Sequence, residues 1–134
     1  MKAQAYLAFR GECENALNFY ADIFNAQIEN RQTYQDSKQD IPEHYRNNLQ
    51  HAELKGDGIN IMAYDVSPDT PLNSGNNIQM SVEINDKEKA LEIFNQLSKN
   101  GKVHDNFRER EWNALFGRCT DQYDIQWMVN CQLN

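Results

Sequence analysis

An order of elements that occurs twice is the strongest constraint on how this chain can fold. In the first half, apolar residues three and four positions apart predict one buried face of a helix. They are Cys13, Ala16, Leu17, Tyr20 and Phe24, and Asn25 can end the helix. A second such stripe follows about 73 residues later, made of Ala90, Leu91, Phe94 and Leu97. Each predicted helix has one extended segment before it and three after it, which indicates an internal duplication of βαβββ modules.

The predicted strands are read from alternating or short apolar runs bounded by turn residues. In the first module they span 3–9, 27–34, 50–55 and 59–64, and in the second 78–84, 102–108, 114–120 and 125–131. A capping box of Asn85 and Glu88 is expected to begin the second helix. The chain is therefore predicted to be a single α+β domain over 1–134, with module one at 1–66, a Pro- and Ser-containing linker at 67–76 and module two at 77–134.

Charge and composition exclude several classes of partner. Lys and Arg number 13 against 20 Asp and Glu, which gives a net charge of -7 and argues against nucleic acid as a partner. No apolar run approaches the ~20 residues that would span a membrane, so a cytoplasmic protein is expected. The three cysteines, Cys13, Cys119 and Cys131, cannot all pair, and free thiols in a reducing compartment are the simpler interpretation.

Four strings, taken together in this order, resemble the vicinal-oxygen-chelate superfamily of glyoxalases, dioxygenases and bleomycin- and fosfomycin-resistance proteins, and most closely its PhnB-like branch. They are YLAFRGECENALNFYADIFNAQI at 6–28, HAELKGDGINIMAYD at 51–65, NNIQMSVEINDKEKALEIFNQLSKNGKV at 76–103 and WNALFGRCTDQYDIQWMVN at 112–130. The chain departs from the resemblance at Asp121, Gln122, Tyr123 and Asp124, where such proteins usually carry an Asp-Pro-Phe-Gly-like turn.

The resemblance implies two open half-barrels with helices packed outside, a ligand cavity inside and a homodimer. Strand alternation independently predicts which residues lie on the helix-packed side, because successive side chains point to opposite faces. The apolar residues Ile78, Met80, Val82 and Ile84, and Ile125, Trp127 and Val129, are expected on that side. The opposite side is expected to bind a small polar organic molecule, since amides both donate and accept hydrogen bonds. Its predicted ligand-binding residues are Asn60, Met62, Tyr64, Asn77, Gln79, Ser81, Gln126, Met128 and Asn130, with Trp112 as an aromatic wall or lid.

The metal-dependent members of the superfamily hold a divalent ion with His, Gln or Glu side chains. The resemblance puts Ala5, Met62, Asn77 and Met128 at those four positions, and none of them is a good ligand. The expectation is therefore no metal and no other cofactor. The alternative is a displaced site at His51 and Glu53, which share a strand face, although a solvated or edge-strand face is the simpler explanation because Lys55 continues the same polar row.

Three functions follow as hypotheses. The first is a binding protein without the usual metal, with or without a catalysed reaction; the second is a metal-dependent lyase, isomerase or dioxygenase; the third is a dimeric interaction module. Cys13 at the first helical turn is a candidate nucleophile or redox-sensitive group, with a buried structural thiol as the alternative. Arg108 and Arg110 are candidates to meet an anionic group at the cavity mouth, with surface ion pairing as the alternative.

Overall fold

A computed structural model of the chain describes residues 1–133. It divides into two compact units, Met1–Asn73 (unit 1) and Ser74–Asn134 (unit 2). The boundary falls inside the expected linker, 67–76. Each unit contains one helix and one four-stranded sheet, and the two sheets have the same topology, so the predicted α+β fold of two βαβββ modules is confirmed.

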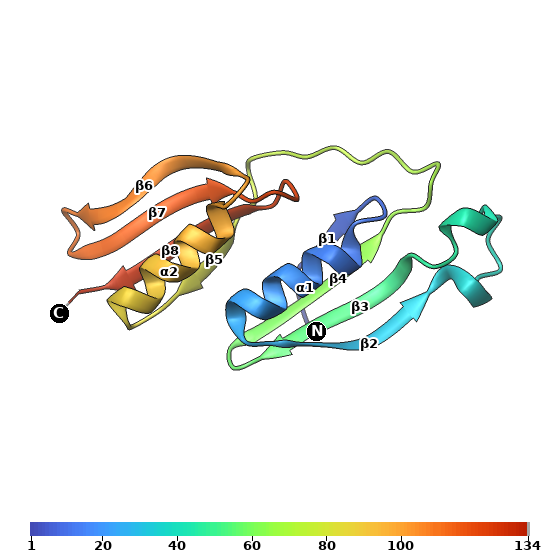
Figure 1. Cartoon of the computed structure of the whole chain (residues 1–134), viewed down its shortest axis with the longest axis horizontal. Coiled ribbons are helices and arrows are strands. Elements are labelled where there is room, and N and C mark those ends of the chain that lie inside the picture. Colours follow the sequence, from blue (N-terminus) through green and yellow to red (C-terminus); the bar gives the residue numbers. More distant parts are fainter. Residues whose placement is uncertain (134) are drawn as a thin grey trace. The chain divides into compact units, whose positions relative to one another are not determined.

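Unit 1 contains its sheet in the order β1-β4-β3-β2. Its elements are β1 (Tyr6–Phe9), α1 (Cys13–Phe24), β2 (Gln27–Thr33), the short 3-10 turns η1 (Tyr34–Asp36) and η2 (Glu43–Tyr45), β3 (Leu49–Gly56) and β4 (Ile59–Asp65). β1 runs parallel to β4, and the other neighbours are antiparallel. The sheet is open, and α1 lies across one of its faces (Figure 1).

The helix α1 lacks a side-chain cap of its own, because Glu12 at its N-cap makes no such hydrogen bond. A buried carboxylate from the end of β4 takes that role. Asp65 is 1% exposed, and its two oxygens accept the backbone N–H groups of Cys13 and Leu49, each at 2.9 Å. Burial raises the pKa of Asp65, while these backbone donors act in the opposite direction. Asp65 therefore joins the end of β4 to the start of α1 and to the start of β3.

Unit 2 repeats this arrangement with its sheet in the order β5-β8-β7-β6. Its elements are β5 (Met80–Glu83), α2 (Lys87–Ser98), β6 (Lys102–Arg110), β7 (Ala114–Thr120) and β8 (Gln126–Gln132). β5 is parallel to β8, and α2 lies across one face of this open sheet (Figure 1). Trp127 and Val129 are buried on the helix side, as predicted.

Details at the start of unit 2 differ from the sequence expectations. The first strand begins at Met80, so Ile78 precedes it and is 81% exposed rather than part of the core. The helix is capped by Asp86, whose side chain accepts the N–H groups of Glu88 and Lys89, and the expected capping box is wrong. Ile93, rather than the half-exposed Leu91, completes the buried stripe.

The turn between β7 and β8 is built around two aspartates. Asp121 is buried and accepts backbone N–H groups from Tyr123 and Ile125 at 2.7 and 3.1 Å, and the indole N–H of Trp127 at 2.7 Å. Asp124 has a φ of 69°, a left-handed conformation that glycine adopts most easily. The unusual turn sequence thus keeps a tight geometry at the cost of strain at Asp124.

All three cysteines are free and buried, so the prediction of unpaired thiols is confirmed. Burial, with a smaller effect from Asp65, raises the pKa of Cys13 well above its ordinary range. The Cys13 side chain is fully buried, so a structural thiol fits this position and a reactive thiolate does not, because desolvation disfavours the charged form. Within residues 1–133, neither helix is long and apolar enough to cross a membrane.

Candidate functional site

The face of the unit 1 sheet that α1 does not cover carries polar and aromatic side chains. Strand register places Tyr6 beside Met62, and Met62 beside Glu53 on the neighbouring strand. The predicted residues Asn60, Met62 and Tyr64 alternate on this side of β4: Asn60 is exposed, Tyr64 is half-buried and Met62 is only 6% exposed.

Tyr6, His51 and Tyr64 form a cluster on this face. The Tyr6 hydroxyl lies 3.0 Å from His51 Nδ1, and the Tyr6 ring centroid lies 5.7 Å from that of His51 and 6.0 Å from that of Tyr64. Glu53 Oε2 lies 3.8 Å from His51 Nε2. The Glu53 carboxylate also accepts a hydrogen bond from Asn30, and this bond is the main cause of the lowered pKa of Glu53. The structure therefore brings together the pair that the sequence singled out as the displaced metal alternative.

The uncovered face of the unit 2 sheet carries the amide and methionine side chains of β8. Gln126, Met128 and Asn130 are half-buried there, and Asn130 donates to Glu83 of β5 at 3.2 Å. Ser81 lies on the same side because it pairs with Met128. The sidedness expected from strand alternation is thus present in β8.

Neighbouring strands add two residues to this face: Arg118, which the sequence interpretation omitted, and Phe116, for which it considered an aromatic wall but favoured core packing. In register, Phe116 pairs with Asn130 and Arg118 with Met128, so both side chains lie beside the amide row. Their alternation with the buried positions Gly117 and Cys119 is the signal that would have placed them there. Tyr6 in unit 1 could have been found in the same way, since it alternates with a buried neighbour.

Three other predicted site residues lie outside the strands. Asn77 and Gln79 precede β5, because that strand starts later than expected. Trp112 lies in the turn between β6 and β7 and is 55% exposed. Its ring meets Phe116 edge-on, with 5.8 Å between centroids, so the indole borders the uncovered face of unit 2.

The divalent ion of the metal-dependent superfamily members does not fit the residues present. Ala5, Met62, Asn77 and Met128 supply no imidazole and no carboxylate. His51 and Glu53 are close enough to share an ion, but across residues 1–133 no group of three or more His, Cys, Asp or Glu side chains could hold one. These side chains therefore give no support to a metal-dependent reaction in this chain.

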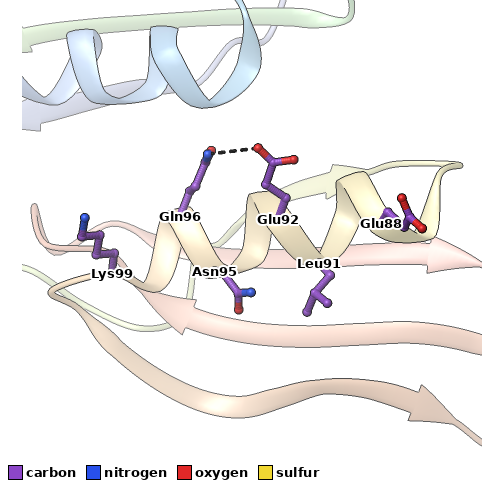
Figure 2. Close-up of a pocket in the computed structure, with 6 residues that line it drawn as sticks. All are labelled: Glu88, Leu91, Glu92, Asn95, Gln96 and Lys99. Carbon is purple, nitrogen blue, oxygen red and sulfur yellow. Dashed lines mark hydrogen bonds between the residues drawn. The ribbon is translucent and has the colours of Figure 1, made fainter.

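A recess of about 480 Å³ lies along the exposed side of α2 (Figure 2), on the side of the unit 2 sheet that this helix covers. Five of its six lining residues belong to the helix and the sixth, Lys99, is the residue that ends it: Glu88, Leu91, Glu92, Asn95, Gln96 and Lys99. Gln96 donates to Glu92 one helical turn away at 3.4 Å. A recess with walls from one helix only, and with one apolar side chain among five polar ones, lacks the enclosing, mostly apolar walls typical of a ligand site.

The fold of the two units is that of glyoxalase-like proteins. A glyoxalase family protein from Bacillus cereus has the same fold, with a TM-score of 0.68 and 13% identity over 99% of this chain and 94% of that one. A protein named PA1353 from Pseudomonas aeruginosa is more similar, with a TM-score of 0.87 and 29% identity over 99% and 100% of the two chains.

The chain belongs to the PhnB-like family described as 3-demethylubiquinone-9 3-methyltransferase, whose model matches residues 1–130. A solved structure described as a putative member and PhnB protein, from Bacillus cereus, has a TM-score of 0.83 and 21% identity over 100% of both chains. The protein YjdN of Escherichia coli is 26% identical over 97% of this chain and 95% of its own length. Membership does not by itself transfer the activity in the family's description, because one fold hosts many chemistries.

Proposed function

We propose that this chain is a cytoplasmic, homodimeric binding protein that takes up a small polar organic molecule on the uncovered faces of its sheets. The observation that carries the proposal is the row of Gln126, Met128 and Asn130 along β8. These side chains are half-buried, and the Gln126 amide has no hydrogen-bond partner among residues 1–133. A half-buried amide of this kind can donate to a ligand and accept from it, while the methionine adapts to apolar surface.

The donor set supports binding without the superfamily's usual metal. The side chains at the resemblance-implied ligand positions are alanine, methionine and asparagine, which suit contact with an organic molecule better than coordination of a divalent ion. The ligand's polar groups would then be held by hydrogen bonds from amides and hydroxyls of the sheet.

A thermal-shift screen of chemically diverse small molecules tests the proposal, because a ligand that binds only the folded state raises its stability. A hit should lose its effect in a Gln126→Leu variant. The matched control is Gln122→Leu, which changes the same residue type in the exposed β7–β8 turn. A screen without hits, or hits unaffected at Gln126, would count against the site.

Two further measurements separate the alternatives. Analytical ultracentrifugation should show a dimer, and a monomer at micromolar concentration would remove that part of the proposal. Metal analysis of protein purified without a His tag should find no stoichiometric divalent ion. An ion that is present and lost in His51→Ala would instead favour the metal-dependent enzyme. Recovery of a protein partner in place of any small ligand would favour the interaction module.

A further inference from the structure

Three arginines and one carboxylate lie on the uncovered face of unit 2, and one of the arginines is paired with that carboxylate. Arg118 Nε lies 2.6 Å from Asp105 Oδ2, and this bond is the main cause of the lowered pKa of Asp105. The charges of Arg118, Arg110 and Arg108 lower that pKa further, which places all three guanidinium groups within electrostatic reach of it. Among the described residues, Arg118 is therefore the arginine that pairs with this carboxylate.

Arg110 is held in place by the main chain rather than by an acidic partner. Its Nη2 donates to the carbonyl oxygens of Asn106 and Phe116 at 2.7 and 3.0 Å, and its Nε donates to the latter at 3.3 Å. The guanidinium carbon also lies 5.5 Å from the centre of the Phe116 ring. A guanidinium fixed in this way loses little side-chain entropy when it binds an anion.

Arg108 lies next to it on the same side of β6, paired in register with Phe116. Among residues 1–133, no carboxylate oxygen lies within 4.0 Å of Arg108 or Arg110, so the alternative of surface ion pairing for these two is wrong. The only bond of Arg108 in this part of the chain is a long one, 3.5 Å, to the carbonyl of Glu109.

Opposing charge on this face is sparse. Besides Asp105, the acidic side chain that strand register places on it among the described residues is Glu83, which lies on β5 beyond β7 and β8 and accepts the Asn130 amide. In a chain of net charge -7, two arginines without a carboxylate partner form a local exception to the prevailing charge. Trp112 and Phe116 add flat aromatic surface beside them.

We propose that Arg108 and Arg110, flanked by Trp112 and Phe116, bind the carboxylate of a small aromatic acid. The Arg108 guanidinium offers parallel N–H donors that match the two oxygens of a carboxylate, and Arg110, whose Nε and Nη2 bind main-chain carbonyls, offers its Nη1. The exposed indole gives the acid's ring a surface against which to stack. This inference rests on the proposed function and specifies its ligand class: an organic anion with a planar ring.

Titration with benzoate and its neutral counterpart benzamide tests the charge requirement, with amide chemical shifts and tryptophan fluorescence as readouts. Benzoate should bind about tenfold or more tightly than benzamide, as expected for one charge-assisted contact. The Arg108→Gln variant should weaken benzoate binding about tenfold and leave benzamide binding unchanged. Arg31→Gln is the matched control, because Arg31 is ion-paired with Glu14 in unit 1.

The outcomes separate this inference from the proposed function. Equal affinity for benzoate and benzamide, or benzoate binding that Arg108→Gln does not change, overturns the anion site. If benzoate fails while neutral compounds still bind through Gln126, the anion site is overturned and the proposed function stands. If neither anionic nor neutral compounds bind, both are overturned. Native-like amide shifts in Arg108→Gln establish that the variant is folded.

Discussion

Replacing the buried Asp65 with asparagine removes one acceptor from the junction where β4, α1 and β3 meet. Both carboxylate oxygens accept a backbone N–H, one from Cys13 and one from Leu49, each at 2.9 Å. Backbone N–H groups can only donate, so both oxygens must accept. Asparagine offers one oxygen and one NH2 group, and one of the two N–H groups would therefore face another donor.

The cost follows from these two contacts. A hydrogen bond to a charged group contributes roughly 1.5 to 3 kcal/mol, and a buried donor left unpaired costs roughly 1 to 3 kcal/mol. The neutral amide relieves some of the desolvation that raises the pKa of Asp65, which favours the lower part of the combined range. We expect Asp65→Asn to lower the free energy of unfolding by about 3 kcal/mol, a large share of a typical total of roughly 5 to 15 kcal/mol.

Urea unfolding followed by far-UV circular dichroism at pH 7 measures this difference. Hydrogen exchange should also become faster at the amides of Cys13 and Leu49, which locates the damage. Asp57→Asn, in the exposed β3–β4 turn, is the control and should stay within about 0.5 kcal/mol of the wild type. An Asp65→Asn protein as stable as that control would refute the account of Asp65 as the link between these elements.

Three further predictions concern unit 2. Gly117→Ala should destabilise by roughly 1 to 3 kcal/mol in urea unfolding, because its Cβ would lie 2.7 Å from the Phe94 ring, whereas Gly75→Ala in an open loop should have little effect. Asp124→Gly should raise stability by about 0.5 to 1 kcal/mol by calorimetry, since glycine removes the left-handed strain at φ 69°. Burial raises the pKa of Cys119 from 9.0 to about 12, so iodoacetamide at pH 8.5 should leave it unmodified until urea is added. Because the unfolded thiol ionises first, stability should also fall as pH rises from 9 towards 12.

The order of elements was readable from the sequence because each carries a strong local signal. The strand 114–120 was predicted with its observed bounds, and Asn25 ends α1 in the left-handed conformation that such a residue tolerates. Sidedness in β8 followed from alternation alone, since Trp127 and Val129 are buried, whereas Gln126, Met128 and Asn130, which alternate with them, are half-buried.

Errors arose where two local signals competed. Asn85 and Asp86 can both cap a helix, and the choice between them sets the residue at which α2 begins. The alternation of apolar residues begins at Ile78, whereas the pairing of β5 with β8 begins at Met80. An apolar pattern in one strand does not show where its neighbouring strand ends.

The candidate site was less predictable than the fold because it depends on contacts between strands. Asp105 meets Arg118, and Arg108 lies beside Phe116, only through the register of β6 against β7, and the shifts in that register cannot be read from one strand. His51 and Glu53 were identifiable because both lie on the same strand, two residues apart.

The division into two units gives each one its own optical label. Both tryptophans, Trp112 and Trp127, lie in unit 2, whereas of the six tyrosines Tyr123 alone lies there. The indole of Trp127 is 1% exposed and bonded to a buried carboxylate, so its emission should change when that core opens. Tryptophan emission thus reports the second βαβββ unit and tyrosine absorbance mainly the first. Whether the two copies of this fold unfold together or in sequence can be followed without adding a probe.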